Sequence, residues 1–339
     1  MAMPPLARMI LRRVVVGVPA ILGVLVVTFL LVRLSGESPA TYLAGPHATQ
    51  AEVQEVSEKL GLGRSIGEQL WIYLGDVARG DLGESWLSDR PVLDELAERL
   101  PVTLELVLLA MLLGGISGVL LGLKAAFSAG GRLDRIINIV AITTFSVPVY
   151  VVGLLAILVV FYWLGWAPAP MGRLSLSVFP PPVVTGSYFI DGLLAGDLEV
   201  VRSAGYQLWL PTLCFSLIVA GPTVKQTRAI LLEVLGSDYV RYARACGLPR
   251  RDINRIAIRN SLVPVATFLA FELSYLFAAS SLIELIFAWG GIGQYGLTAI
   301  LQGDFTAVQG YVLFLAAFSL LVYFLADLFV FVVEPRSRS

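Results

Sequence analysis

The sequence predicts an all-α protein that crosses a membrane several times, with six transmembrane helices. Of its 339 residues, 57% are hydrophobic and 14% are charged, whereas soluble domains contain roughly 45–50% apolar and about 25% charged residues. Six apolar runs reach the roughly 20 residues that a helix needs to cross a bilayer core of about 30 Å. The mean hydropathy of +0.80 also excludes an intrinsically disordered chain.

Charge and residue content exclude several further classes of protein. The net charge of -1 provides no basic face for phosphates, so we expect no nucleic-acid partner. One histidine, His47, and two cysteines, Cys214 and Cys246, are too few for a zinc site, an iron cluster or a disulfide framework. We therefore predict no catalytic, cofactor-binding or metal-binding residue, and we expect His47 to be an ordinary surface side chain.

The six runs are predicted to be helices because an open strand edge cannot face lipid, and they lack the alternation of a membrane barrel. The first follows Arg8, Arg12 and Arg13, as in a signal peptide, but its apolar part exceeds the roughly 7–15 residues of a signal core. The predicted spans cover residues 9–32, 102–127, 136–164, 206–232, 262–287 and 307–333.

The distribution of basic residues predicts that both termini are cytoplasmic. Of the 24 Lys and Arg residues, 16 lie on the side that holds the N-terminus, and an excess of positive charge marks the cytoplasmic side. On the other side, residues 34–101 are acidic and contain amphipathic stretches at 53–60 and 92–100, so we expect a folded segment. The second outer segment, residues 165–205, contains five prolines and is predicted to be an irregular loop.

This topology divides the chain into three parts. Residues 1–100 hold the first span and the outer segment, residues 101–333 hold spans two to six, and residues 334–339 form a cytoplasmic tail. In span two, Gly114, Gly115, Gly118 and Gly122 predict close contact with another helix.

The loop between spans four and five, about residues 233–261, carries six of the 16 inner basic residues, and two more, Lys225 and Arg228, immediately precede it. We predict two short helices here: the first starts near Ser237 and ends at Gly247 in a left-handed conformation, with Pro249 preventing its continuation. In the second helix Ile253, Ile256, Ala257 and Asn260 form one stripe, and arginines form another beside it. One interpretation of the arginines is that they only keep this loop on the cytoplasmic side of the membrane and contact anionic lipid head groups. The small residues, however, favour docking into a partner's groove.

This loop resembles the "EAA loop" in the membrane subunits of binding-protein-dependent ABC importers, through YVRYARACGLP (239–249) and RNSLVP (259–264). The likeness is closest to the B-type permease of the dipeptide, oligopeptide and nickel branch, and it covers almost the whole chain. The other motifs that carry it are ILRR (10–13), GDLGES (80–85), FSVPVY (145–150), ELIFAWGGIG (284–293) and EPR (334–336). Arg241 stands where the loop's name expects Glu, Gly290 where Pro is usual, and Glu334 where Asp is usual.

The resemblance implies a type I importer fold in a bacterial inner membrane. It implies that the chain forms half of a translocation path with a second permease subunit, which is usually a different chain. Two ATPase subunits and an extracytoplasmic substrate-binding protein complete such an importer. The residues implied to form the ATPase-coupling helix are Arg241, Tyr242, Ala243, Arg244, Ala245 and Gly247.

The residues themselves predict that this chain does not hydrolyse ATP. A phosphate-binding loop needs a lysine after a glycine, but none of Lys59, Lys124 and Lys225 follows a glycine. We therefore expect no cofactor in this chain, which is a transport subunit and not an enzyme. ATP and Mg are expected in the partner ATPase subunits.

Polar residues and prolines within the spans are candidates for the translocation path or its gate. Carboxylates in a membrane must face protein or water, so Glu284 is a candidate for the outer gate or forms a bond to a neighbouring helix, and Glu272 has the same two interpretations. Pro148 and Pro222 break the hydrogen-bond ladder within spans three and four. The resemblance places the outer constriction near Glu284 and Trp289.

Two other function classes remain as alternatives. A secondary transporter that works without an ATPase is expected to show inverted repeats, and we find none. A membrane-embedded enzyme needs a Ser/His or paired-Asp constellation within the spans, where the sequence places no histidine and one aspartate, Asp327. The solute is left open among dipeptides, oligopeptides, nickel, glutathione and sugars.

Overall fold

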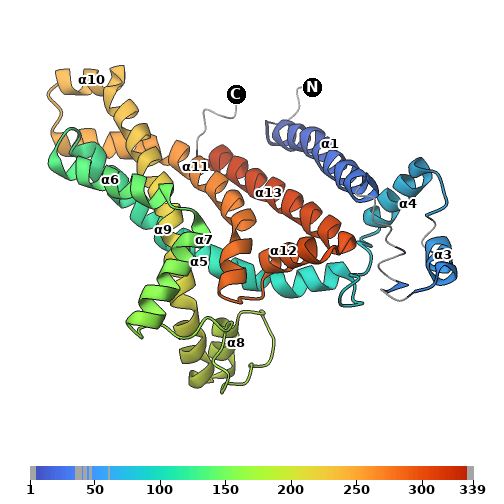
Figure 1. The fold of residues 1–339 in the computed structure, drawn as a ribbon. Coiled ribbons are helices and arrows are strands. Elements are labelled where there is room, and N and C mark those ends of the chain that lie inside the picture. Colours follow the sequence, from blue (N-terminus) through green and yellow to red (C-terminus); the bar gives the residue numbers. More distant parts are fainter. Residues whose placement is uncertain (1–4, 35–39, 41–43, 46–47, 60–61, 334–339) are drawn as a thin grey trace. The chain divides into compact units, whose positions relative to one another are not determined.

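The computed structural model of the chain is built of helices (Figure 1), and it describes residues 5–34, 40, 44–45, 48–59 and 62–333. The predictions for His47 and for the EPR motif lie outside these residues. The helices are α1 (Pro5–Leu34), α3 (Gln50–Lys59), α4 (Ile66–Ala78), α5 (Val92–Phe127), α6 (Arg132–Ser146), α7 (Val149–Ala156), the π-helix η1 (Ile157–Trp163), α8 (Tyr188–Ala195), α9 (Leu198–Gly236), α10 (Asp238–Ala245), α11 (Arg250–Ile286), α12 (Ile292–Gln302) and α13 (Phe305–Val333).

Five of the described helices are long and apolar enough to cross a membrane: α1, α5, α9, α11 and α13. A sixth candidate is the pair formed by α6 and the combined α7–η1 segment, whose axes differ by 97°. The fold is therefore the all-α, multi-span fold that the sequence predicts.

The third span, predicted over residues 136–164 with an interruption at Pro148, consists of two helical segments that meet at this proline. Helix α6 ends at Ser146, Val147 is extended with φ -88° and ψ 126°, and Pro148 precedes the first residue of α7. Proline lacks a backbone N–H and disfavours helical geometry in the residue before it. The chain therefore turns by 97° inside an apolar stretch.

Three helix boundaries that hydropathy predicts are wrong. Helix α9 begins at Leu198, inside the predicted irregular loop, because the Asp197 side chain accepts hydrogen bonds from the backbone N–H groups of Glu199 (3.0 Å) and Val200 (3.1 Å). Helix α11 begins at Arg250, so the predicted second short helix is the first part of a 37-residue helix. The amphipathic stretch at 92–100 likewise continues into α5. Local capping sets the start of α9, whereas hydropathy reports only where lipid begins.

The chain forms two compact units, and α5, α12 and α13 each contribute residues to both. The second unit comprises Pro101–Gln294 and Leu321–Ser339, and in it α9 packs against α6, α7, α8 and α11. A Cβ on Gly114, Gly118 or Gly122 would collide with α9, so the close helix contact predicted for these glycines is confirmed. Gly115 instead faces the Leu269 side chain, at 3.6 Å.

The first unit comprises Met1–Leu100 and Tyr295–Leu320, and the described part of the acidic segment 34–101 is folded, as expected. Ser65 and Glu68 form a reciprocal capping box at the start of α4. The Ser85 hydroxyl donates a hydrogen bond to the Asp304 carboxylate at 2.6 Å, and the Trp86 and Phe305 rings meet edge to face at 5.7 Å.

Candidate functional site

The predicted coupling segment is a helical elbow, formed by α10 between the end of α9 and the start of α11 (Figure 1). The elbow comprises residues 237–249. At its first bend Ser237 is extended, with ψ 155°, and its hydroxyl donates to the Val234 carbonyl at 2.6 Å. This residue ends α9 and allows α10 to leave in a new direction.

A Schellman motif closes α10. Gly247 has φ +76°, its backbone N–H donates to the Arg244 carbonyl at 3.0 Å, and the Leu248 N–H donates to the Ala243 carbonyl at 3.2 Å. Pro249 then precedes the first residue of α11. The left-handed glycine and the proline stop that the sequence predicts are both confirmed.

A single side chain of α10, Val240, is fully buried. The stripe predicted on the next helix is partly confirmed, because Ile253 and Ala257 are buried whereas Ile256 is half-buried and Asn260 is exposed. Ala257 belongs to a buried cluster with Ala126 of α5 and Leu231 of α9. The elbow is therefore held by a small apolar contact, and most of its surface is free within this chain.

The six residues predicted for coupling lie together on the exposed surface of this elbow. Tyr242 is 72% exposed, and Arg241, Arg244, Ala245 and Gly247 are also exposed, while Ala243 is half-buried. The side chain of Arg241, 74% exposed, forms an ion pair with Asp238 at 3.5 Å. The surface combines positive charge, an aromatic ring and small residues, a composition that suits docking into an acidic groove of another protein.

Two of the predicted gate residues, Glu284 and Trp289, lie together in a buried hydrogen-bond network of the second unit. The Glu284 carboxylate accepts hydrogen bonds from the Thr103 hydroxyl (2.7 Å) and from the backbone N–H of Gln294 (2.9 Å). Thr103 in turn accepts from the backbone N–H of Ile292 at 2.8 Å. Glu284 therefore joins α5 and α11 to the start of α12. Of the two interpretations that the sequence allows for Glu284, the structure shows the hydrogen bond to a neighbouring helix.

Trp289 closes the turn between α11 and α12. Its backbone N–H donates to the Glu284 carbonyl at 2.7 Å, its indole N–H donates to the Val102 carbonyl at 3.3 Å, and its side chain is buried. Gly290, which follows, has φ +77°. Proline cannot adopt this angle, because its ring fixes φ near about -65°. The turn in this chain therefore requires the glycine that stands at position 290, where proline is usual in the family that the motifs resemble.

The structure does not bring the other predicted pathway residues into this network. Glu272 is buried in α11 and makes no hydrogen bond or ion pair among the described residues. Pro148 is exposed at the break between α6 and α7, and Pro222 is half-buried inside α9. A Cβ on Gly221, beside Pro222, would crowd the Ala141 carbonyl and Phe145 of α6.

The sequence analysis missed an ion pair between α6 and α9. The Arg228 guanidinium donates two hydrogen bonds to the Asp134 carboxylate, at 2.7 and 2.9 Å, and Asp134 also accepts from the Gly130 N–H at 2.9 Å. Sequence reasoning counted Arg228 only as a topology signal. Because the partners are 94 residues apart, one sequence carries no signal for their pairing.

The loop before α8 is organised by one buried carboxylate, that of Asp191. It accepts hydrogen bonds from the backbone N–H (2.7 Å) and hydroxyl (2.7 Å) of Thr185, and from the N–H of Gly186 (3.0 Å) and Val184 (3.3 Å). Burial alone would raise the pKa of the Asp191 carboxyl, but the hydrogen bonds to its charged form outweigh burial and hold the pKa below its ordinary 3.8.

Comparison with known proteins decides the family. Residues 118–339 match the family described as "Binding-protein-dependent transport system inner membrane component", and residues 6–107 match the N-terminal domain of the same kind of component. This chain belongs to that family. It is therefore a multi-pass permease subunit of a binding-protein-dependent importer, located in the inner membrane.

Curated relatives confirm the B-type peptide branch that the motifs indicate. The chain is 38% identical to the "Probable D,D-dipeptide transport system permease protein DdpB" of Escherichia coli K12, over 93% of this chain and 92% of that protein. It is 36% identical to the "Di/tripeptide transport system permease protein DppB" of Pseudomonas aeruginosa UCBPP-PA14 and 34% identical to the "Dipeptide transport system permease protein DppB" of E. coli K12. Each match covers 97% of this chain and 98% of the relative.

Proposed function

We propose that this family member forms half of the path for dipeptides or oligopeptides in an ATP-driven importer, together with a second and different permease chain. The family description supports delivery of the solute by a binding protein. The names of the relatives, which specify dipeptides and tripeptides, support a peptide solute.

The exposed elbow is the observation that carries the proposed mechanism. Helix α10 buries one side chain, Val240, while Tyr242 and the basic residues beside it remain uncovered. We infer that residues 241–247 dock into a cleft of a cytoplasmic ATPase subunit, which binds ATP and Mg. Closure of the ATPase pair then moves α10, and α9 and α11 pass this movement into the membrane.

The proposed topology follows from this docking. Both termini and the elbow are assigned to the cytoplasm, because the excess of Lys and Arg lies on their side. Residues 1–100 then form the first helix and the extracytoplasmic segment, residues 101–333 form the transport domain, and residues 334–339 form a cytoplasmic tail.

We assign the translocation path to the region of Pro148, Pro222 and Glu272, with Glu284 and Trp289 supporting the outer gate. Glu272 is a buried carboxylate without a partner among the described residues, and an intramembrane carboxylate requires protein or water as a neighbour. We infer that it faces the second permease subunit or the path. The hydrogen bonds of Glu284 indicate that it positions the α11–α12 turn and does not contact the solute.

Cross-linking tests the docking of the elbow. In a Cys246→Ser background, Tyr242→Cys is expected to cross-link to a co-expressed ATPase subunit, because Cys246 is the exposed free cysteine and Cys214 is buried. Tyr206→Cys, 46% exposed on α9, is the matched control and is expected not to cross-link. Equal cross-linking at both positions, or none at Tyr242, would contradict the proposal.

Reconstitution separates the proposal from its alternative. Liposomes that contain the full complex, with ATP inside, are expected to take up peptide delivered by the binding protein. Uptake by this chain alone without ATP would instead establish a secondary transporter. Competition among dipeptides, longer peptides and nickel ions in the same liposomes identifies the solute class.

A further inference from the structure

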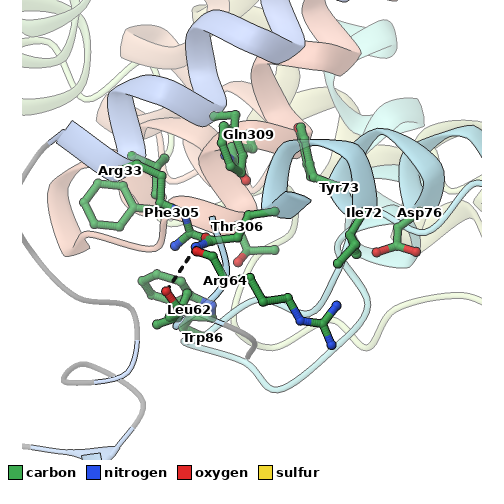
Figure 2. Close-up of a pocket in the computed structure, with 13 residues that line it drawn as sticks. Arg33, Leu62, Arg64, Ile72, Tyr73, Asp76, Trp86, Phe305, Thr306 and Gln309 are labelled. Carbon is green, nitrogen blue, oxygen red and sulfur yellow. Dashed lines mark hydrogen bonds between the residues drawn. The ribbon is translucent and has the colours of Figure 1, made fainter. Parts of the chain in front are cut away.

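A pocket of about 350 Å³ lies in the first unit, near the end of α1 (Figure 2). Its walls come from the last turn of α1, from α4 and the residues before it, from Trp86, and from the start of α13. The volume is near the lower end of the roughly 300–1,000 Å³ of small-molecule sites. The pocket therefore suits a small polar group and is too small for a protein segment.

Two buried polar atoms of the pocket residues have no hydrogen-bond partner among the described residues. Within this part of the chain, the Nε of Arg33 is a buried donor without an acceptor, and the Oε1 of Gln69 is a buried acceptor without a donor. The amide of Gln69 is fixed in orientation, because its Nε2 donates to the carbonyls of Leu62 (3.1 Å) and Arg64 (2.9 Å). Native proteins satisfy almost all such buried groups. A ligand that carries both an anionic acceptor and a hydrogen-bond donor would satisfy both atoms.

The charge of the pocket favours an anion. Arg33 lies partly buried inside it and Arg64 lies at its exposed rim, and neither forms an ion pair in the described part of the chain. The acidic residue of the lining, Asp76, is paired with Arg79 at 3.1 Å, and in Figure 2 it lies at the edge of the view away from Arg33. The free positive charge is therefore that of the two arginines.

The surroundings of the pocket favour an amphiphile over a soluble anion. The Phe29 and Tyr73 rings stack in the pocket wall at 5.7 Å, and the Arg33 guanidinium lies 5.3 Å from the centre of the Phe29 ring. Helix α1 is a candidate span of which only 17% of the apolar window is buried, so most of its apolar surface is uncovered in this chain and available to lipid. Trp71 of α4, 79% exposed, has the amphipathic ring that is typical of the membrane–water boundary.

We propose that this pocket binds the head group of an anionic phospholipid that carries hydroxyl groups, such as phosphatidylglycerol. The phosphodiester accepts hydrogen bonds from Arg33, with Arg64 adding charge at the rim, and a head-group hydroxyl donates to Gln69. The acyl chains follow the apolar surface of α1 into the bilayer.

The test measures lipid binding to the assembled transporter in detergent, by native mass spectrometry and by thermal stability. Phosphatidylglycerol is compared with phosphatidylethanolamine, phosphatidylcholine, inorganic phosphate and a dipeptide as probes. We expect phosphatidylglycerol to be retained and to raise the melting temperature most. Arg33→Gln should weaken its apparent affinity at least about ten-fold, because a hydrogen bond to a charged group is lost.

Two further variants separate the binding site from general instability. Gln309→Glu places a carboxylate in the same pocket and should displace the lipid anion without removing a cation. Arg202→Gln is the matched control, because Arg202 is exposed on α9 and lies outside the pocket lining. It should bind phosphatidylglycerol as the unchanged chain does.

Equal retention of phosphatidylcholine or phosphatidylethanolamine would overturn the proposal. Equal protection by inorganic phosphate would show a soluble-anion site, and equal protection by the dipeptide would show a solute site, so each result also contradicts it. If Arg33→Gln fails to fold, unchanged lipid binding by Gln309→Glu is sufficient to reject the assignment.

Discussion

Gly247→Arg tests the central claim, that the elbow couples the permease to a separate ATPase. The structure separates two consequences of this change. Gly247 has φ +76°, and a side chain in this left-handed region costs about 1–2 kcal/mol. A Cβ at Gly247 meets no atom within 4 Å, so the change adds no collision within the chain.

The matched control is Gly196→Arg at the end of α8. Gly196 has φ +69° and also has no atom within 4 Å of an added Cβ. The two variants therefore carry the same charge and the same backbone strain of about 1–2 kcal/mol. Any further loss of transport in Gly247→Arg measures obstruction of a docked partner.

We expect Gly247→Arg to insert in the membrane normally and to lower ATP-driven uptake in proteoliposomes at least about 100-fold, equivalent to about 2.7 kcal/mol of lost docking free energy. Gly196→Arg should retain most uptake. Gly247→Asn should also retain most uptake, because asparagine is short and tolerates the left-handed conformation. Normal uptake by Gly247→Arg, or equal loss in Gly196→Arg, would refute the reasoning.

Three further changes test the residue networks. Glu284→Gln should lower stability by about 1–3 kcal/mol, because the Thr103 hydroxyl and the Gln294 N–H donate to different carboxylate oxygens and an amide has an acceptor oxygen at only one of these positions. Peptide uptake by this variant should fall while the ATPase subunit still copurifies with the permease. Loss of the complex would show that Glu284 has a purely structural role. Asp134→Asn breaks the paired hydrogen bonds to Arg228 and should cost about 2 kcal/mol, measured by thermal unfolding; an unchanged melting temperature would contradict this. The pKa of Asp191 is lower in the folded chain than its ordinary value of 3.8. Its contribution to stability is therefore complete when the pH is above 3.8, and it is lost as the pH falls through the pKa of the folded state. Hydrogen exchange in the preceding loop should therefore accelerate in acid, and Asp191→Asn should abolish this pH dependence; an unaltered pH profile would oppose the assignment.

The sequence predicts the elements whose signals are local. Long apolar runs identify the spans, and Gly247 followed by Pro249 identifies the end of α10, because a left-handed glycine and a proline act on the backbone beside them. The exposure of the Tyr242 side chain, in contrast, could not be predicted from the sequence. The 3.6-residue period places residues on one face, but it does not say whether that face is covered.

Features that depend on distant partners or on local competition could not be predicted. Pro148 could be recognised as an interruption of the third span, but the size of the 97° turn could not be predicted, because it depends on how α6 and α7 each pack against α9. Glu284 could be recognised as an unusual intramembrane carboxylate, but its partner Thr103 lies 181 residues earlier. The continuity of the predicted second short helix with span five was missed, because a helix can pass from a basic segment into an apolar one without interruption.

The lengths of α9 and α11 have a mechanical consequence for the elbow. With 39 and 37 residues, the two helices extend about 58 and 55 Å, nearly twice the thickness of a hydrocarbon core of about 30 Å. Neither is interrupted by a loop, so α10 sits at the tip of a helix pair that reaches deep into the membrane. Pro211 and Pro222 in α9 and Pro264 in α11 each remove a backbone hydrogen bond, so a push on this tip is expected to bend the two helices at these prolines.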